Sequence, residues 1–212
     1  MLLIRKPEME IKSGLSVPLM EQYYTIQGEG INVGKAAYFI RLAGCDVGCV
    51  WCDVKDSWDV KKHPEITVKD IVKNALQHPT RMAVITGGEP LMHNLDHLCN
   101  ELRKSGYTTC IETSGAYPLS GSWDWICVSP KKFKAPLKSV LTKANELKVI
   151  VYNKSDFNWA AEQAAFVNER CKLLLQPEYG RFTEVMPLIV DYVKLYPQWQ
   201  ISIQTHKFIN VP

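Results

Sequence analysis

Residues 37–53 read AYFIRLAGCDVGCVWCD, a short apolar run that is followed at once by three cysteines. The run at 37–43 is almost continuously apolar, which is typical of a strand buried in a parallel sheet. Cys45, Cys49 and Cys52 then stand at the spacing C-x3-C-x2-C. Because three thiolates leave one position of a metal site open, this loop predicts a metal centre that takes part in chemistry.

The remainder of the chain alternates segments of strand and helix character. We expect strands at 37–43, 82–86, 107–113, 123–129, 146–152, 171–176 and 199–206. Helical spacing of apolar residues covers 66–78, 94–105, 157–170 and 182–195. Strict alternation predicts right-handed βα units and a mostly parallel sheet. The expected fold is α/β, a partial, truncated (β/α) barrel, formed by a single domain over residues 1–212.

Composition narrows the possible partners and the compartment. Lys and Arg together number 25 and Asp and Glu 22, a net charge of +3 that is too even to indicate a nucleic-acid or membrane surface. The first twenty residues mix charged and apolar side chains, unlike a secretory signal. Seven cysteines, three of them clustered, fit a reducing compartment better than a disulfide framework. We therefore expect a cytoplasmic protein with no nucleic-acid or membrane partner.

Polar or turn-forming residues follow six of the expected strands. In a parallel sheet the carboxyl ends of the strands meet along one edge, where active sites collect. These residues are therefore expected to surround one cavity. They are the cysteine loop, GGEP at 87–90, TSG at 113–115, SPK at 129–131, QP at 176–177 and THK at 205–207.

Two kinds of metal centre compete for the cysteine loop. A structural zinc site needs a fourth ligand, such as His63 or His93, and is usually built from paired ligands, but no second C-x2-C pair is present. A 4Fe-4S cluster held through three irons keeps its fourth iron free for a small molecule. The spacing favours the cluster, and a zinc-stapled module without catalytic activity stays open as an alternative.

The cysteine spacing, with Trp51 just before the last cysteine, resembles the signature of radical S-adenosylmethionine (radical SAM) enzymes. In that family S-adenosylmethionine chelates the open iron, and its reductive cleavage yields a 5′-deoxyadenosyl radical. Residues 86–90, TGGEP, resemble the element that holds the methionyl amino group. The resemblance implies a 4Fe-4S cluster on Cys45, Cys49 and Cys52, and no catalytic residue beyond the cofactor-derived radical.

A narrower resemblance covers nearly the whole chain. Its segments are similar to those of radical SAM enzymes that convert 6-carboxy-5,6,7,8-tetrahydropterin into 7-carboxy-7-deazaguanine with loss of ammonia, on the path to queuosine and other 7-deazapurines. They are 25–30, 39–41, 52–53, 112–115, 129–131, 176–177 and 204–207. The resemblance implies hydrogen abstraction from C6 of the pterin, ring contraction and regeneration of S-adenosylmethionine. It also implies a homodimer and an electron donor such as flavodoxin or ferredoxin.

The same resemblance assigns individual residues. Arg41 would pair with the substrate carboxylate through a bidentate fork. The substrate-binding set is Ile26, Gln27, Gly28, Arg41, Thr86 and Pro212, the last through its terminal carboxylate. The S-adenosylmethionine set is Trp51, Cys52, Asp53, Gly88, Ser129, Pro130, Lys131 and Gln176. A glycyl-radical activating enzyme, which carries the same cysteine spacing, stays open as an alternative.

One position departs from the family pattern. Its magnesium ligand is a Thr or Ser hydroxyl two residues after the last cysteine, where this chain has Val54. Mg²⁺ requires oxygen ligands, and valine has none in its side chain. Either the ion is held by the substrate, waters and a carboxylate such as Asp53 or Asp56, or the reaction depends little on Mg²⁺.

Overall fold

The computed structural model describes residues 14–212, and one nine-stranded sheet organises this part of the chain. The spatial order is β3-β1-β2-β4-β5-β6-β7-β8-β9. The strands are β1 (Ser16–Ile26), β2 (Ala36–Leu42), β3 (Glu65–Thr67), β4 (Met82–Gly87), β5 (Thr108–Thr113), β6 (Trp125–Val128), β7 (Glu146–Val151), β8 (Lys172–Pro177) and β9 (Trp199–Ile201). From β2 to β9 all pairings are parallel, whereas β1 pairs antiparallel with β2 and β3. The sheet is open, because its edge strands β3 and β9 do not pair.

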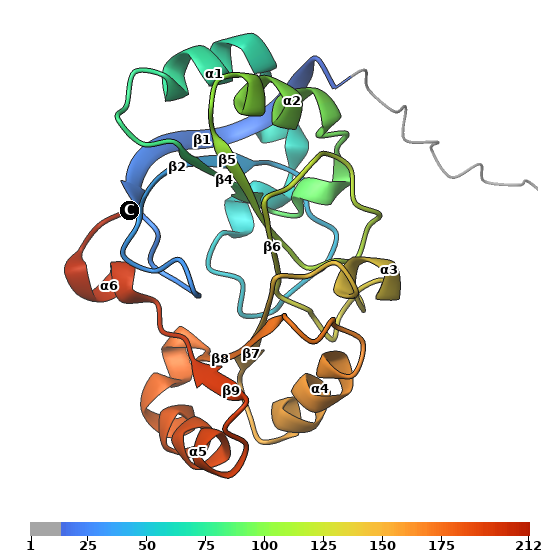
Figure 1. Cartoon of the computed structure of the whole chain (residues 1–212), viewed down its shortest axis with the longest axis vertical. Helices are drawn as coiled ribbons and strands as arrows, with labels where there is room; N and C mark the ends of the chain where they lie inside the picture. The colour runs from blue at the N-terminus through green and yellow to red at the C-terminus, as the bar shows by residue number, and fades with distance from the viewer. Residues whose placement is uncertain (1–13) are drawn as a thin grey trace, which may run out of the picture.

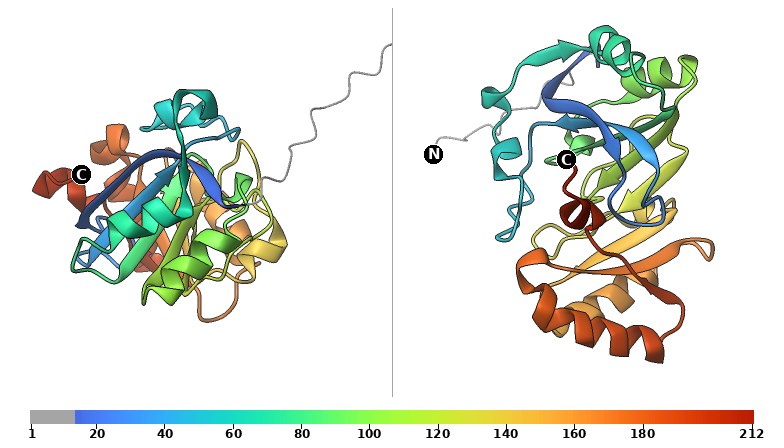
Figure 2. Two further views of the ribbon diagram at one scale, coloured as in Figure 1. Left: turned by 90° about the horizontal axis from the view of Figure 1, so that it is seen from above. Right: turned by 90° about the vertical axis from the view of Figure 1, so that its left-hand side faces the viewer.

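Helices cover the outer side of the curved sheet (Figure 1 and Figure 2). They are α1 (Val68–Ala75), α2 (Asp96–Lys104), α3 (Lys138–Leu141), α4 (Ser155–Ala164) and α5 (Phe182–Leu195), and a last short helix, α6 (Thr205–Ile209), lies near the end of β1. Short 3-10 turns occupy Lys55–Trp58, Val60–Lys62, Pro90–Met92 and Tyr179–Arg181. The mostly parallel, partial α/β barrel expected from the sequence is confirmed.

Alternation along each strand separates the core from the inner face. Side chains at every second position point to the same side of a sheet. Those on the outer side pack under the helices and are fully buried, among them Ile40, Ile85, Ile111, Leu147 and Leu175. A small second cluster on the other side contains Ala37, Phe39, Val84 and Cys110. The positions that continue this inner face near the strand ends are polar, and they are Arg41, Thr86, Glu112, Lys148 and Gln176.

The strand β1 was not expected from the sequence. It contains Pro18, which lacks an N–H and normally argues against a strand with neighbours on both sides. The chain tolerates it because the Pro18 carbonyl accepts a hydrogen bond from Ala43 N at 2.9 Å, while Leu19 N donates to Pro64 O at 2.9 Å. A register shift between Leu19 and Glu21 adjusts the pairing with β2. An antiparallel strand therefore precedes the first parallel unit.

Three further expectations need correction. The helix expected at 66–78 begins only after Thr67, whose hydroxyl accepts from Asp70 N at 3.2 Å, because residues 65–67 pair with β1. The strand expected at 199–206 ends at Ile201, because the chain then turns away from the sheet toward α6. No helix separates β5 from β6, so strand and helix do not alternate strictly in residues 14–212.

Within residues 14–212 no helix is long and apolar enough to cross a membrane. Most of the first twenty residues, for which no targeting segment was expected, lie outside the described residues. The domain expected over 1–212 likewise includes residues that the structure does not describe.

The core on the outer side of the sheet can be tested at Ile85, which lies on β4 and is fully buried. Ile85→Ala should lower the free energy of unfolding by about 2–5 kcal/mol, because the truncated side chain leaves a cavity. Denaturant unfolding monitored by circular dichroism measures this. Leu195→Ala, at a position 69% exposed on α5, is the control and should change it by less than about 0.5 kcal/mol. Equal losses in the two variants would contradict this assignment of the core.

Candidate active site

A cavity of about 290 Å³ lies on the inner face at the carboxyl ends of the parallel strands. All six of the strand-end loops picked out from the sequence contribute to its lining. The convergence of these loops on one cavity is therefore confirmed. Of the residues assigned by resemblance, those lining it are Ile26, Gln27, Gly28, Arg41, Cys45, Cys49, Trp51, Cys52, Asp53, Thr86, Gly88, Ser129, Lys131, Gln176 and Pro212. Pro130 is buried and does not line the cavity.

Close backbone packing joins the cysteine loop to the GGEP loop. Gly88 N donates to Leu42 O at 3.0 Å, and Glu89 N donates to Gly44 O at 2.8 Å. A Cβ on Gly88 would overlap Gly44 O and lie 2.8 Å from the Cβ of Cys45. The glycine is thus required by the approach of the chain to itself, in addition to any role toward a ligand.

The Glu89 carboxylate holds the contact between the cysteine loop and the GGEP loop in place. Its side chain is buried, with Oε1 accepting from Thr113 Oγ1 at 2.6 Å and from Leu91 N at 3.0 Å. Its Oε2 accepts from Ser114 N at 2.8 Å and from the Ser114 hydroxyl. The ends of β4 and β5 are therefore held together beside the cysteine loop.

The three cysteines of the loop fit a cluster held through three irons. Their thiols are free and line the same cavity. Burial raises the pKa of the Cys45 and Cys49 thiols, and the nearby Cys52 raises both further, so the three sulfur atoms lie close enough to influence one another. In residues 14–212 no set of three His, Cys, Asp or Glu side chains is already arranged around one metal position. Three soft donors facing a cavity match an iron–sulfur cluster with one open side.

The two histidines considered as a fourth zinc ligand are engaged elsewhere. His63 Nε2 lies 2.9 Å from Asp56 O, and His93 Nε2 lies 2.7 Å from Ala43 O. Neither residue lines the cavity that the cysteines share. The donor set is therefore that of an open three-thiolate site.

Lys131 lies beside the cysteine loop on the loop after β6. Its ammonium donates to Ser129 O at 2.6 Å and Ser129 Oγ at 2.7 Å, and it stands 5.7 Å from the centre of the Trp51 ring. Burial lowers its pKa, although the Cys49 thiol opposes this effect. These contacts orient three of the residues that the resemblance assigns to S-adenosylmethionine.

Arg41 on β2 brings a cation to the cavity. Its Nε donates to Glu21 Oε1 at 2.6 Å and its Nη2 to Tyr23 OH at 2.8 Å. Its Nη1 makes no hydrogen bond to the described residues, and the side chain keeps 19% of its surface exposed. Part of the guanidinium fork is therefore still able to bind a ligand carboxylate.

The loop before β2 is packed against the last residues of the chain. Thr205 N donates to Gly28 O at 2.8 Å, and a Cβ on Gly28 would lie only 2.6 Å from His206 Cβ. The Thr25 hydroxyl donates to the backbone oxygen of Pro212 at 3.3 Å. Pro212 and Gly28, both assigned to substrate by resemblance, are thus brought to the same wall.

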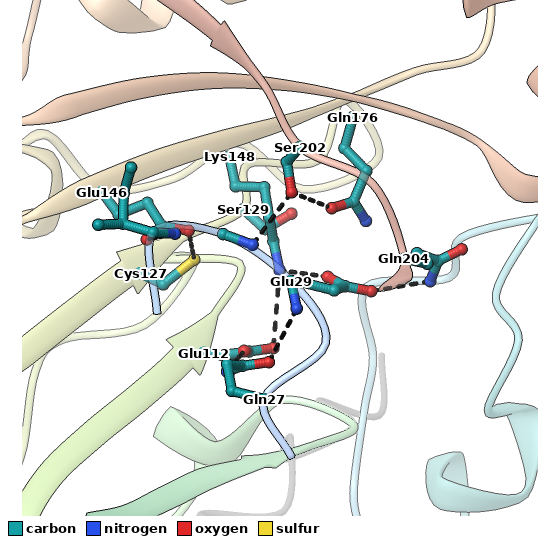
Figure 3. A network of polar contacts seen from close by, with 12 residues as sticks. Gln27, Glu29, Glu112, Cys127, Ser129, Glu146, Lys148, Gln176, Ser202 and Gln204 are labelled. Atoms are coloured by element: carbon teal, nitrogen blue, oxygen red, sulfur yellow. Dashed lines mark hydrogen bonds and ion pairs between the residues drawn. The ribbon is translucent and has the colours of Figure 1, made fainter. Parts of the chain in front are cut away.

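Among the further cavity residues, Lys148 was missed by the sequence analysis. Four others lie in segments quoted there but were given no individual role, namely Glu29, Glu112, Gln204 and His206. Most of them form the polar network of Figure 3, in which Lys148 on β7 is ion-paired with Glu29. Its ammonium also lies 3.8 Å from Glu112 Oε2. The signal that would have found Lys148 is the alternation Glu-Leu-Lys-Val-Ile-Val in β7, which places Glu146 and Lys148 on the inner face.

Charges in this network are tightly held. Burial by itself would raise the pKa of Glu29, but Lys148 and hydrogen bonds from Gln204 and Gln176 lower it to about 2. Burial would likewise lower the pKa of Lys148, but the neighbouring carboxylates raise it well above its usual value. Lys148 and Glu29 are therefore a charged pair over the physiological pH range.

Val54, which stands where the family pattern has a hydroxyl ligand for magnesium, lines the cavity with an apolar side chain. Of the two carboxylates considered in its place, Asp53 lines the cavity, with Oδ2 at 3.4 Å from Lys207 Nζ. Asp56 does not line the cavity and pairs with Lys62 at 3.4 Å. Asp53 is thus the better placed of the two.

Comparison with known proteins agrees with this geometry. Residues 39–127 match the model of the Radical SAM superfamily. The chain is 50% identical to 7-carboxy-7-deazaguanine synthase from Flavobacterium psychrophilum over 211 residues, which cover 100% of both chains. It is 46% identical over 198 residues to the Synechocystis protein of the same name, covering 93% of this chain and 94% of the relative. The crystal structure of QueE from Escherichia coli is similar, with a TM-score of 0.82 at 30% identity, covering 95% of this chain and 100% of that one.

The fold, the cysteine loop and the superfamily match define a radical SAM enzyme, a class that uses a 4Fe-4S cluster and S-adenosylmethionine. Full-length identity to curated relatives specifies the family within that class. The chain belongs to the 7-carboxy-7-deazaguanine synthase family.

The packing of Gly88 against the cysteine loop yields a test. Gly88→Ala should displace that loop, because the new Cβ overlaps Gly44 O, and should reduce the iron bound after anaerobic reconstitution severalfold. Iron and sulfide analysis measures this without any assay of turnover. Gly180→Ala is the matched control, since its Cβ would meet only the end of the Glu178 side chain at 3.3 Å. Normal iron content in Gly88→Ala would show that the junction does not support the cluster loop.

Proposed function

We propose that this chain catalyses the conversion of 6-carboxy-5,6,7,8-tetrahydropterin into 7-carboxy-7-deazaguanine with loss of ammonia. The observation that carries the proposal is one cavity that contains both the three cysteines and Arg41. The cysteines provide the site for radical chemistry, and Arg41 provides a cation for the substrate carboxylate. The names of the full-length relatives support the same reaction, and membership of their family does not favour the activating-enzyme alternative.

Cys45, Cys49 and Cys52 would hold the 4Fe-4S cluster. Together with S-adenosylmethionine, the cluster supplies the one-electron chemistry that begins hydrogen abstraction from C6 of the pterin. Trp51, Asp53, Gly88, Ser129 and Lys131 would hold S-adenosylmethionine beside it, together with Gln176 and the buried Pro130 behind the loop.

The protein's own side chains bind and orient the substrate. Arg41 would bind its carboxylate, and Ile26, Gln27, Gly28, Thr86 and Pro212 would contact the ring system. Aromatic walls from Tyr23, Phe39 and Trp58 complete the cavity and exclude water from the reacting atoms. Holding C6 in a fixed orientation makes the reaction effectively intramolecular, and this accounts for much of the rate enhancement.

We extend the proposal to partners and setting. The enzyme acts in the cytoplasm as a homodimer and a single domain over residues 1–212, and it takes electrons from a donor such as flavodoxin or ferredoxin. Mg²⁺, where used, is held by the substrate, waters and Asp53, because Val54 offers no side-chain oxygen. The position of Asp53 in the cavity lining supports this assignment over Asp56.

Anaerobic turnover tests the proposed function directly. The reconstituted protein, given the carboxytetrahydropterin, S-adenosylmethionine and a reductant, should form 7-carboxy-7-deazaguanine and release ammonia, as measured by chromatography with and without Mg²⁺. Cys49→Ala should bind little cluster and lose turnover, because one of three ligands is gone. A colourless wild-type protein that carries one zinc and forms no product would overturn the proposal in favour of the zinc-stapled module.

Arg41→Ala should raise the KM for the carboxytetrahydropterin roughly 10- to 100-fold with a smaller change in kcat, because a charge-assisted contact is lost. Binding of 6-carboxypterin and of pterin, which lacks the carboxylate, identifies the group involved. The variant should bind 6-carboxypterin more weakly than the wild type does, and pterin equally well. Equal losses for both ligands would remove Arg41 from carboxylate recognition.

A further inference from the structure

Two carboxylates and one ammonium meet in the wall of the cavity. Lys148 reaches from β7 between Glu29, in the loop before β2, and Glu112, on β5 (Figure 3). The Lys148 side chain is 4% exposed, whereas Glu29 and Glu112 keep 16% and 24% of their side-chain surface exposed. All three line the cavity. Two acidic groups therefore share one buried counter-ion.

The two carboxylates differ in their partners. Glu29 is bound by Lys148, by Gln204 Nε2 at 2.8 Å from Oε1, and by Gln176. Glu112 accepts from Gln27 Nε2 at 2.9 Å through Oε1. Its Oε2 has Lys148 at 3.8 Å, beyond hydrogen-bond distance, and no other polar partner among the described residues. Glu29 is thus saturated, whereas Glu112 presents an acceptor that is still open.

Other charged or titratable groups surround Lys148. Glu146 lies two residues earlier on β7 and accepts from Ile31 N at 3.1 Å, and Cys127 Sγ donates to Glu146 Oε1 at 3.4 Å. Lys131 is a second cation that is near enough to influence Lys148. These groups leave the ion pair of Lys148 with Glu29 and its approach to Glu112 in place.

We propose that Lys148 is a positioning residue, which engages Glu29 and thereby keeps Glu112 Oε2 open for an N–H donor of the substrate. This inference rests on the proposed function and names the part of the substrate involved. The 2-amino-pyrimidinone ring of a pterin has adjacent N–H groups, which are suited to a carboxylate. Lys148 acts through Glu112 and does not itself contact the ligand.

The geometry predicts different consequences for each change. In Glu29→Gln the ammonium loses its ion pair and moves onto the open oxygen of Glu112, which lies 3.8 Å away. In Lys148→Met two carboxylates face each other without a counter-ion. In the double variant Glu29→Gln/Lys148→Met, Glu112 again stands open as a single charge. Each single change should therefore weaken binding, and the double change should restore it.

The experiment measures equilibrium binding of 6-carboxypterin to the anaerobically reconstituted protein by quenching of ligand fluorescence. Each single variant should bind on the order of tenfold more weakly at neutral pH, and the double variant within about threefold of wild type. Lys104→Met, which removes an exposed cation paired with Glu101 at 2.8 Å on α2, is the control and should bind like wild type. Circular dichroism verifies that every variant is folded.

A pH series separates positioning from a merely structural role. Without Lys148, burial raises the pKa of Glu29 against only the hydrogen bonds from Gln204 and Gln176, and a proton that Glu29 takes up as the pH falls makes it neutral, as it is in the Glu29→Gln variant. Binding by Lys148→Met should therefore strengthen from about pH 7.5 to about pH 5.5, while wild type and double variant stay flat. A flat profile in Lys148→Met, or a double variant no better than the singles, would overturn the inference. Failure of the wild type to bind 6-carboxypterin would instead count against the proposed function.

Discussion

The active-site end of the sheet depends on the hydrogen bonds that the buried carboxylate of Glu89 accepts. A charge removed from water needs several donors to compensate it, and here they come from the end of β5 and from the short 3-10 turn that follows β4. The backbone of the same residue binds the cysteine loop. One residue thus connects the metal-binding loop after β2 with β4 and β5, so the cysteines are positioned by the sheet and not by their own loop alone.

The sheet produces a reactive cavity because its two faces have different tasks. Outer positions such as Ile85 and Leu147 stabilise the fold under the helices. Inner positions are free to become polar toward the strand ends, where Arg41, Glu112 and Lys148 appear. The free energy gained by burying the outer face therefore offsets the cost of holding charged groups in the wall of a cavity.

Much of this arrangement follows from the sequence. The cysteine spacing, the parallel strands, the convergence of strand-end loops and the bounds of α5 were all predictable from local patterns. β1 was not, because Pro18 interrupts its strand signal and is accommodated only through partners distant in sequence. The alternation in β7 places Lys148 on the inner face, but its role was not predictable, because that role comes from Glu29 and Glu112, which lie on other segments. Interactions between distant segments are what single-sequence patterns do not contain.

The contact of Thr25 with Pro212 joins residues 187 positions apart. Gly28 and Thr205 are joined similarly, so one wall of the cavity consists of the first strand and the last helix. Contacts of such high sequence separation carry a large loop-closure entropy and form after the segments between them are ordered. During synthesis the cysteine loop therefore emerges long before the wall that will enclose it. A chain that stops short of residue 204 lacks this wall of the cavity, so its thiols are more open to solvent and oxidants until the last helix has packed.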